Sequence, residues 1–376
     1  MVSAFYGGSH RSWTDDVLKH VLHDRPCRLL SLSAEQWKWR MMGGAVTLAR
    51  QLMDDGARDQ IELIVCDAMI DLATFLALTR ARTARARVLL YMHENQLTFP
   101  LHADASKGAF RHQDGERDRH FAFINFTSML AADCIAFNSA FHRDQLFAAL
   151  PAFLNHYRDH KELESIAIAR AKSCVLYVGV DLNRRLAPPP SLERSEVPLI
   201  IWNMRWDYDK CPDVFLRVLL AVARQGVAFK LAICGARQTF TDNALDETLA
   251  QLQDRIVHHG LADADLYASL LWRADVTIST AIHEFFGIAV VEAMACAVFP
   301  LLPRRLSYPE LVPGEHHASV LYYDEAHLTH RLTWALTHAA ERRVIAEALS
   351  ASVRARFDWQ TMHVQYREQI QSMMSA

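Results

Sequence analysis

The chain has 376 residues, of which 51% are hydrophobic and 22% charged, and its formal net charge at pH 7 is −3. This length accommodates two domains with separate cores, and the composition excludes a disordered or membrane-spanning protein. A small negative charge argues against a protein that coats nucleic acid without specificity. We find no apolar run near the roughly 20 residues of a membrane helix and no signal sequence, and therefore expect a cytoplasmic protein without membrane contact.

The cysteines and histidines show no metal-binding or disulfide pattern. The seven cysteines stand singly, with no C-x-x-C pair, and the 19 histidines form no H-E-x-x-H motif. Most of the cysteines lie inside apolar runs. We therefore expect free thiols in a reducing compartment and no metal site.

The first half of the chain alternates short apolar runs with amphipathic stretches. Strands are predicted at residues 3–6, 27–32, 61–66, 88–92 and 134–137, and helices at 13–22, 45–53 and 72–78. Strands alternating with helices are typical of a parallel sheet covered on both faces. The pattern therefore predicts a Rossmann-like, doubly wound α/β domain.

Three polar segments follow predicted strands of this domain, where ligands gather in doubly wound sheets. Gly7-Gly8-Ser9-His10 follows the first strand, Trp37-Lys38-Trp39-Arg40 the second, and His93-Glu94-Asn95-Gln96 the fourth. The Gly-Gly turn suits an ordinary tight turn and a ligand loop equally well. The Trp-Lys-Trp-Arg run either anchors a loop or forms a platform for a sugar or base.

Two segments of the first half are rich in cations. Residues 100–119 show no clear period and include Arg111, Arg117 and Arg119, and such a long polar excursion is usually functional or mobile. A second run leads into the fourth strand and consists of Arg80, Arg82, Arg85 and Arg87. We favour a solvated helix end for this second run, and phosphate contact is the alternative.

Three consecutive prolines at 188–190 mark a linker, because they continue neither a helix nor a central strand. We therefore predict a first domain at residues 1–185 and a second Rossmann-like domain at 186–355. Residues 356–376 contain an amphipathic helix, predicted at 359–373, that is long enough to pack back on the first domain.

The second domain has its charged residues beside two predicted strands. Arg205 and Lys210 follow the strand at 199–202, where cations can hold a diphosphate. After the strand at 275–280 come Glu284, Gly287 and Glu292, with a helix predicted behind the glycine. A glycine and a helix start favour an anion, although a carboxylate there is often only a helix cap.

These groups suit the transfer of a sugar from a nucleotide. That reaction needs cations for the departing diphosphate, acceptors for hydroxyl groups and a site that shields an oxocarbenium-like centre. A dinucleotide-dependent oxidoreductase needs a G-x-G-x-x-G motif with an acidic residue some 20 positions later, and the sequence has none.

Arg205 with Lys210, and the pair Glu284-x7-Glu292, resemble the donor motifs of retaining glycosyltransferases of the GT-B fold, whose two Rossmann-like domains face each other across a cleft. More narrowly, the chain resembles the tRNA-queuosine alpha-mannosyltransferases. The runs that carry this resemblance are residues 5–10, 37–40, 91–96, 137–139, 202–210 and 279–287. The sequence departs from the pattern at Ala297, where such transferases usually have glycine.

The resemblance implies transfer of mannose from GDP-mannose, with retention, to queuosine at the wobble position of tRNA-Asp, without a cofactor or a metal. It implies catalytic roles for Glu284 beside the sugar and His93 facing it from the other domain. The implied donor-binding residues are Arg205 and Lys210 for the diphosphate, Glu292 for the ribose, the backbone amides of Phe286, Gly287, Ile288 and Ala289, and Gly8 with Ser9 lining the cleft. The residues expected to contact the tRNA are Trp37, Trp39, Arg40, Glu94, Asn95, Gln96, Arg111, Arg117 and Arg119.

Two other functions remain open from the sequence. One is a GT-B glycosyltransferase with a glycan, lipid or small-molecule acceptor, and the other is a nucleotide-sugar epimerase or a non-catalytic nucleotide-binding module, because a fold does not fix a function. The sequence gives no indication of the oligomeric state.

Overall fold

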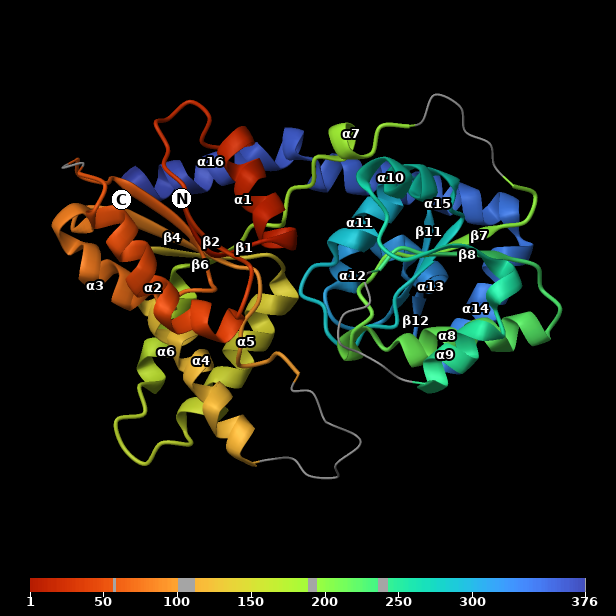
Figure 1. Cartoon of the computed structure of the whole chain (residues 1–376), viewed down its shortest axis with the longest axis horizontal. Coiled ribbons are helices and arrows are strands. Elements are labelled where there is room, and N and C mark those ends of the chain that lie inside the picture. The colour runs from red at the N-terminus through yellow and green to blue at the C-terminus, as the bar shows by residue number, and fades with distance from the viewer. Residues whose placement is uncertain (57–58, 101–111, 189–194, 236–242, 376) are drawn as a thin grey trace. The chain divides into compact units, whose positions relative to one another are not determined.

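The structure is a computed structural model that describes residues 1–56, 59–100, 112–188, 195–235 and 243–375 (Figure 1). The chain folds as two compact units. Unit 1 consists of Met1–Gly179 and Trp359–Ala376, and unit 2 of Val180–Asp358. Each unit contains a six-stranded sheet whose neighbouring strands are parallel. The predicted class, α/β with two Rossmann-like units, is confirmed.

The sheet of unit 1 has the strand order β2-β1-β3-β4-β5-β6. Its strands are β1 (Val2–Tyr6), β2 (Leu30–Ser33), β3 (Leu63–Asp67), β4 (Arg87–Met92), β5 (Cys134–Phe137) and β6 (Ser173–Val175). The order reverses between β1 and β3, which is where open parallel sheets leave a crevice at the carboxyl ends of the strands. The loops after β1 and β3 therefore begin on either side of that point.

Seven helices of unit 1 are described. They are α1 (Gly8–His20), α2 (Trp37–Met53), α3 (Leu72–Thr83), α4 (His112–Ala131), α5 (Ala140–Leu154), α6 (Leu163–Ala171) and α16 (Trp359–Ser375). The helix α16 lies beside α1, where the Trp13 indole N–H donates to the Tyr366 hydroxyl at 3.1 Å. The helices α2, α3 and α4 are neighbours of one another.

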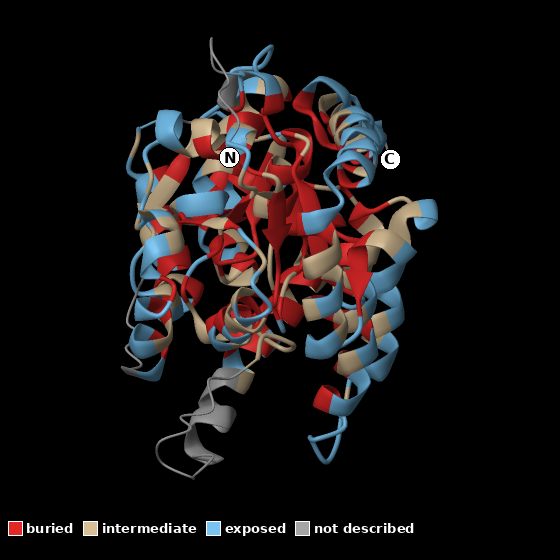
Figure 2. Cartoon of the chain, turned by 90° about the vertical axis from the view of Figure 1, so that its right-hand side faces the viewer, coloured by how far each residue is buried: buried red, intermediate tan, exposed pale blue. Residues whose placement is uncertain are grey.

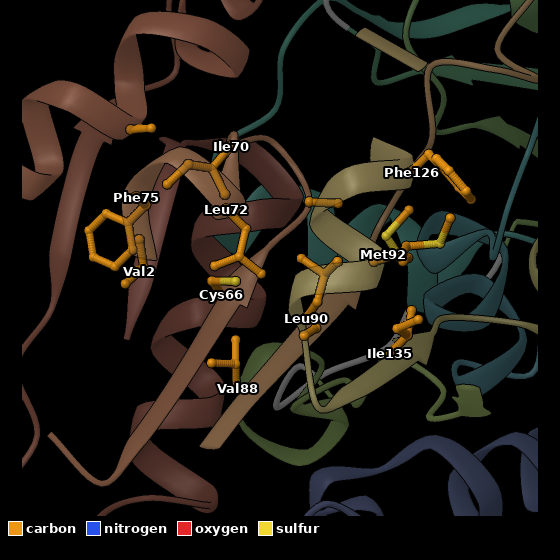
Figure 3. Packing of buried hydrophobic residues seen from close by; sticks show 14 of the residues in the cluster. Val2, Cys66, Ile70, Leu72, Phe75, Val88, Leu90, Met92, Phe126 and Ile135 are labelled. Atoms are coloured by element: carbon orange, nitrogen blue, oxygen red, sulfur yellow. The ribbon is translucent and has the colours of Figure 1, made fainter. Parts of the chain in front are cut away.

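The core of unit 1 lies around its central strands. In β4, the residues Val88 to Met92 are all buried, and Val88, Leu90 and Met92 pack with Phe75 and Phe126 from α3 and α4 (Figure 3). The alternate residue Tyr91 stacks on Trp13 of α1, with ring centroids 4.3 Å apart. Burial on both faces explains why these strands read as continuous apolar runs.

The structure changes the interpretation of two segments of unit 1. The Trp-Lys-Trp-Arg run is the first turn of α2 rather than a loop, so that helix begins eight residues before the predicted start at 45. Gly43 and Gly44 obscure its period, but a Cβ at Gly44 would lie 3.3 Å from the Ala4 Cβ, so glycine permits close packing on β1. The segment 100–119 is helical from His112 onward, and residues 101–111 lie outside the described part of the chain.

The favoured interpretation of the second basic run was also wrong for one member. Arg82 is only 8% exposed and ties the end of α3 to neighbouring segments. Its guanidinium donates to the carbonyl oxygens of Leu52 and Asp59 and pairs with Asp55 at 2.8 Å. A buried guanidinium needs such partners, so Arg82 is a structural residue.

The sheet of unit 2 has the strand order β12-β11-β10-β7-β8-β9. Its strands are β7 (Leu199–Trp202), β8 (Lys230–Ile233), β9 (Ile256–His259), β10 (Val276–Ile278), β11 (Phe299–Pro303) and β12 (Leu321–Tyr322). The order reverses between β7 and β10, which pair directly. The loops after these two strands therefore meet at one edge.

Helices surround this second sheet, and Figure 2 shows buried strands inside helices whose outer faces are exposed. The described helices are α7 (Leu182–Arg185), α8 (Pro212–Arg224), α9 (Asn243–Ala250), α10 (Ala264–Arg273), α11 (Ile288–Ala295), α12 (Tyr308–Leu311), α13 (His317–Val320), α14 (Glu325–Thr337) and α15 (Ala339–Phe357), with short 3-10 turns at Tyr208–Lys210, Gln253–Arg255 and Gly314–His316. Within the described residues of both units, no helix is long and apolar enough to cross a membrane. All seven cysteines are free thiols.

Candidate active site

The loops after β7 and β10 are joined to each other at the carboxyl edge of unit 2. The Thr280 hydroxyl donates to the Lys210 carbonyl oxygen at 2.7 Å, and the Ile282 N–H donates to the Asp209 carbonyl oxygen at 2.9 Å. These bonds fix the Arg205–Lys210 segment against the Glu284 segment. The two sets of charged residues predicted from separate stretches of sequence therefore lie together.

Lys210 is the centre of this edge. It is 7% exposed, and its ammonium contacts the Asp209 carboxylate at 3.1 Å, the Glu284 carboxylate at 3.2 Å and the His283 carbonyl oxygen at 2.9 Å. Burial alone would lower the pKa of Lys210, but attraction to Glu284 and Asp209 outweighs it, and the pKa is raised. Lys210 is therefore a fixed cation between two carboxylates.

Glu284 lies between Lys210 and the start of α11. One of its carboxylate oxygens meets Lys210, and the other lies 3.5 Å from the Phe286 backbone nitrogen. Gly287 precedes α11 with φ 101°, a conformation that glycine adopts without strain. The first amides of α11 have no acceptor within the helix, so Gly287, Ile288 and Ala289 present N–H groups suited to an anion.

The side chain of Phe286 does not belong to this polar edge. It is 2% exposed and packs edge-to-face against Phe357 at a centroid distance of 5.4 Å. The Ser307 hydroxyl donates to the Phe286 carbonyl oxygen at 3.0 Å and so fixes the turn. Only the backbone of Phe286 is therefore available to a ligand.

Glu292 is held one turn into α11. The Tyr267 hydroxyl donates to its carboxylate at 2.7 Å, and the Asn203 amide donates to the Tyr267 oxygen at 3.0 Å and to the Ala289 carbonyl oxygen at 2.8 Å. Burial, followed by the charge of Glu292, raises the pKa of Tyr267 well above its usual value, so the phenol stays a donor. The network links the loop after β7 to α10 and α11.

Arg205 is the more exposed of the two predicted cations. Its side chain is 51% exposed and lies 3.5 Å from the Asp207 carboxylate. An exposed guanidinium reorients at little cost and can bind phosphate through two parallel hydrogen bonds. Arg205 is therefore better placed than Lys210 to follow a bound anion.

In unit 1, Gly8 and Ser9 lie at the carboxyl end of β1, in the first turn of α1, and both are exposed. The backbone at Gly8 has φ 51°, which favours glycine. Gly7 is required for packing, because a Cβ there would overlap the Ala34 side chain after β2. The loops after β1 and β2 therefore touch.

His93, at the carboxyl end of β4, belongs to an aromatic cluster. Its ring centroid lies 4.4 Å from that of His10, 4.6 Å from Tyr91 and 4.7 Å from Trp13. Burial, and then His10 and His142, lower the pKa of His93 well below its usual value, so its imidazole is neutral. Its Nε2 is buried without a hydrogen-bond partner among the described residues, which leaves one ring nitrogen for a ligand.

The predicted acceptor residues after His93 are partly engaged within their own turn. Asn95 is 1% exposed, and its side-chain oxygen accepts hydrogen bonds from the backbone N–H groups of Leu97 and Thr98 at 3.1 and 2.9 Å. The side-chain amide of Gln96 donates to the Glu94 carboxylate at 2.8 Å. Glu94 and Gln96 are half-buried, so they are more accessible than Asn95.

The other predicted acceptor residues lie on α2 and α4. Trp37 is half-buried against Phe121 at 5.2 Å, Trp39 is 57% exposed, and Arg40 donates to the Ser33 carbonyl oxygen at 3.0 Å. Arg119 is half-buried on α4. Arg111 lies outside the described residues, and Arg117 lies in α4 with a side chain that is not described.

The sequence reasoning missed four residues that touch the predicted ones. They are His10 beside His93, Asp209 beside Lys210, and Asn203 with Tyr267 beside Glu292. Three of them lie within three positions of a predicted residue, so their nearness in sequence was a usable signal. Tyr267 is 25 residues from Glu292, and only the tertiary fold reveals it.

Comparison with known proteins identifies a family for each of the two parts of the chain. Residues 1–180 match the family described as tRNA-queuosine alpha-mannosyltransferase N-terminal, and residues 183–349 match the glycosyl transferases group 1. The tRNA-queuosine alpha-mannosyltransferase of Drosophila melanogaster is 30% identical over 341 residues, which are 88% of this chain and 85% of that protein.

Solved structures show the same fold at low sequence identity. A glycosyltransferase from Rickettsia africae has a TM-score of 0.63 at 16% identity and covers 99% of this chain and 89% of its own. The sucrose-phosphate synthase from Thermosynechococcus elongatus has a TM-score of 0.63 at 15% identity, with 92% and 80% covered. The architecture is thus that of the GT-B glycosyltransferases. Together with the match to the Drosophila protein, it follows that this chain is a glycosyltransferase and belongs to the tRNA-queuosine alpha-mannosyltransferase family.

Proposed function

We propose that this glycosyltransferase moves mannose from GDP-mannose, with retention, to queuosine at the wobble position of tRNA-Asp, in the cytoplasm and without a metal or other cofactor. The observation that carries the proposal is the carboxyl edge of unit 2, where Lys210, Glu284, Glu292 and the first amides of α11 lie together. The family and the Drosophila relative, named for the tRNA-queuosine reaction, support the acceptor.

The edge of unit 2 supplies groups for each part of a nucleotide sugar. Arg205 and the amides of residues 286–289 stabilise the negative charge that develops on the departing diphosphate. Glu292, oriented by Tyr267, accepts hydrogen bonds from the ribose hydroxyls. Lys210 compensates the charge of Glu284 and holds that carboxylate beside the sugar. In this position Glu284 orients the reacting carbon.

Residues of unit 1 serve the sugar and the acceptor. The neutral imidazole of His93 offers Nε2 to a sugar hydroxyl, and a neutral ring avoids repelling an oxocarbenium-like centre. Gly8 and Ser9 leave an open backbone beside the same strand edge. The predicted acceptor residues of α2, α4 and the turn after β4 contact the tRNA.

The test is transfer of one hexose to tRNA. The protein is incubated with GDP-mannose and queuosine-containing tRNA, and the nucleosides are analysed by mass spectrometry. Queuosine should gain one hexose, and tRNA that carries guanine at the wobble position should gain none. Transfer to a lipid or glycan with none to tRNA would refute the proposed acceptor.

A matched pair of variants tests the donor site. Glu284→Gln should lower kcat at least a hundredfold while GDP still binds, because the charge beside the sugar is lost and the nucleotide contacts remain. Glu310→Gln, on the nearby helix α12, serves as the control and should behave like the unmodified protein. An unchanged kcat for Glu284→Gln would contradict the role given to Glu284 and favour a non-catalytic nucleotide-binding module.

A further inference from the structure

The helix α2 presents an exposed apolar stripe beside the acceptor candidates. Its members are spaced by three, four and seven residues and are exposed by 57% at Trp39, 37% at Met42, 54% at Val46 and 38% at Met53. Exposed large side chains that repeat on one helix face commonly mark a binding surface. The stripe starts in the first turn of α2, just after the carboxyl end of β2.

Trp39 is held in an unusual way at the start of this stripe. Gly43 lies one turn further along α2, and a Cβ there would overlap the indole ring of Trp39. The ring therefore lies along its own helix, over a position without a side chain, and Trp39 as a whole residue is 57% exposed. A glycine in a helix interior costs about 1 kcal/mol relative to alanine, and Gly43 lies in such a position.

Trp37 and Trp39 differ sharply, although the sequence places them in one motif. Trp37 packs against Phe121 and borders the small core of Met41, Met69 and Ile124. Lys38 lies over the Trp37 ring at 5.4 Å. Trp37 thus anchors the start of α2 to the small core. Of the two tryptophans, Trp39 is the one that offers an exposed aromatic surface to a partner.

The charges of α2 identify the kind of partner. The helix has three cations, Lys38, Arg40 and Arg50, and no acidic residue. Two of these cations lie in the first turn, where the helix dipole disfavours positive charge. Lys38 and Arg40 are the sequence neighbours of Trp39, and a flat aromatic ring next to such cations suits a nucleobase with its phosphates better than an apolar protein surface.

We propose that Trp39, supported by Gly43, is a stacking platform for an unpaired base of the RNA acceptor. This inference rests on the proposed function for the identity of the RNA. Stacking of a base on an aromatic side chain contributes sequence-tolerant affinity, and the cations of α2 contact the flanking phosphates. Trp39 is a binding residue for the acceptor and takes no part in the chemical step.

The test measures both tRNA binding and transfer. Trp39→Ala should weaken the Kd for fluorescently labelled queuosine-containing tRNA about tenfold and raise the KM for that tRNA by a similar factor, with a much smaller change in kcat. Trp39→Phe should retain most of the affinity, because it keeps an aromatic face. Ile168→Ala, a 58% exposed residue of α6, is the matched control and should bind like the unmodified protein.

The variant Gly43→Ala distinguishes a loss of the stacking platform from a loss of protein stability. The added methyl displaces the indole, so tRNA affinity should fall as in Trp39→Ala, while the unfolding midpoint stays the same or rises because alanine favours the helix. Unchanged tRNA affinity in Trp39→Ala would overturn the inference. If Trp39→Ala loses self-association in ultracentrifugation while its tRNA binding stays intact, the inference is also overturned, and the stripe is assigned to a contact between copies of the chain. Absence of hexose transfer by the unmodified protein would refute the proposed function alone, because tRNA binding is measured separately.

Discussion

At the scale of single residues, the candidate donor site depends on a few hydrogen bonds that fix carboxylates. Glu292 is half-buried, and the Tyr267 hydroxyl at 2.7 Å orients its side chain before any ligand arrives. Asn203 in turn supports Tyr267 and the Ala289 carbonyl oxygen. A carboxylate held in this way binds a diol without first losing rotational freedom.

Tyr267→Phe should therefore weaken donor binding. The variant removes a charge-assisted hydrogen bond, worth about 1.5–3 kcal/mol, and leaves Glu292 free to rotate. We expect the KM for the nucleotide sugar to rise roughly tenfold with a smaller change in kcat, as steady-state kinetics at saturating acceptor can measure. In the double variant with Glu292→Gln, the loss should be less than the sum of the two single losses. Full additivity would contradict the coupling.

Ala297 stands where transferases of this type usually have glycine, and its backbone conformation costs stability. It ends α11 in the left-handed conformation, with φ 57°, and the Val298 N–H bonds to the Ala293 carbonyl oxygen at 3.1 Å. This is a Schellman ending, in which the left-handed position is usually glycine. The departure noted in the sequence thus strains the helix end and leaves the donor contacts untouched.

Ala297→Gly should accordingly stabilise the protein. A left-handed alanine costs about 1–2 kcal/mol, and part of the gain is offset by the greater freedom of glycine in the unfolded chain. We expect urea denaturation to give a free energy of unfolding about 0.5–1 kcal/mol higher, with unchanged catalytic constants. Ala295→Gly, inside the same helix, should have the opposite effect. A destabilising Ala297→Gly would exclude strain at this position.

At the scale of elements, two neighbouring loops create the charged edge of unit 2. Lys210 comes after β7 and Glu284 after β10, and the pairing of these strands brings them together. His283, in the same loop, is 6% exposed, and burial followed by the charge of Lys210 lowers its pKa to about 4. The folded protein thus keeps His283 neutral at pH values where the unfolded chain would protonate it.

The stability of unit 2 should therefore fall in mild acid. The histidine of the unfolded chain has a pKa near 6.5 and therefore binds a proton before the folded protein does. The free energy of unfolding is unaffected by His283 above pH 6.5, and it decreases as the pH falls from 6.5 toward 4. At pH 5 this loss is about 2 kcal/mol relative to pH 7. Urea unfolding at the two pH values measures it, and His283→Asn should show a smaller difference. An equal difference in both proteins would assign the pH dependence to other groups.

The elements also show what the sequence could predict. The central strands were recognisable because both of their faces are buried and give apolar runs, and β5 was predicted with its observed bounds at Cys134–Phe137. The start of α2 was missed because Gly43 and Gly44 interrupt its period, although close packing on Ala4 accounts for Gly44. The pairing of Lys210 with Glu284 depends on strand order, which periodicity does not encode.

At the scale of the whole molecule, the two ends of the chain build one unit. Unit 1 contains residues from Met1 to Gly179 and the terminal segment from Trp359, whereas unit 2 is continuous. The segment is integral to unit 1, since the Tyr366 hydroxyl accepts from Trp13 and donates to the Tyr177 carbonyl oxygen at 3.0 Å. Unit 1 can complete its core only after the last helix has been synthesised.

Truncation after Asp358 should therefore unfold unit 1 and spare unit 2. It removes five buried side chains of α16, namely Trp359, Met362, Tyr366, Ile370 and Met373. At roughly 1.5–3 kcal/mol for each, the loss approaches the whole stability of about 5–15 kcal/mol of an ordinary domain. Limited proteolysis with mass spectrometry should show rapid cleavage within residues 1–179 and a resistant fragment from unit 2. Truncation after Met373 keeps every buried contact of α16 and should resist proteolysis like the full chain. If residues 1–179 stay resistant without α16, the terminal helix is only an accessory to a core that the first segment completes alone.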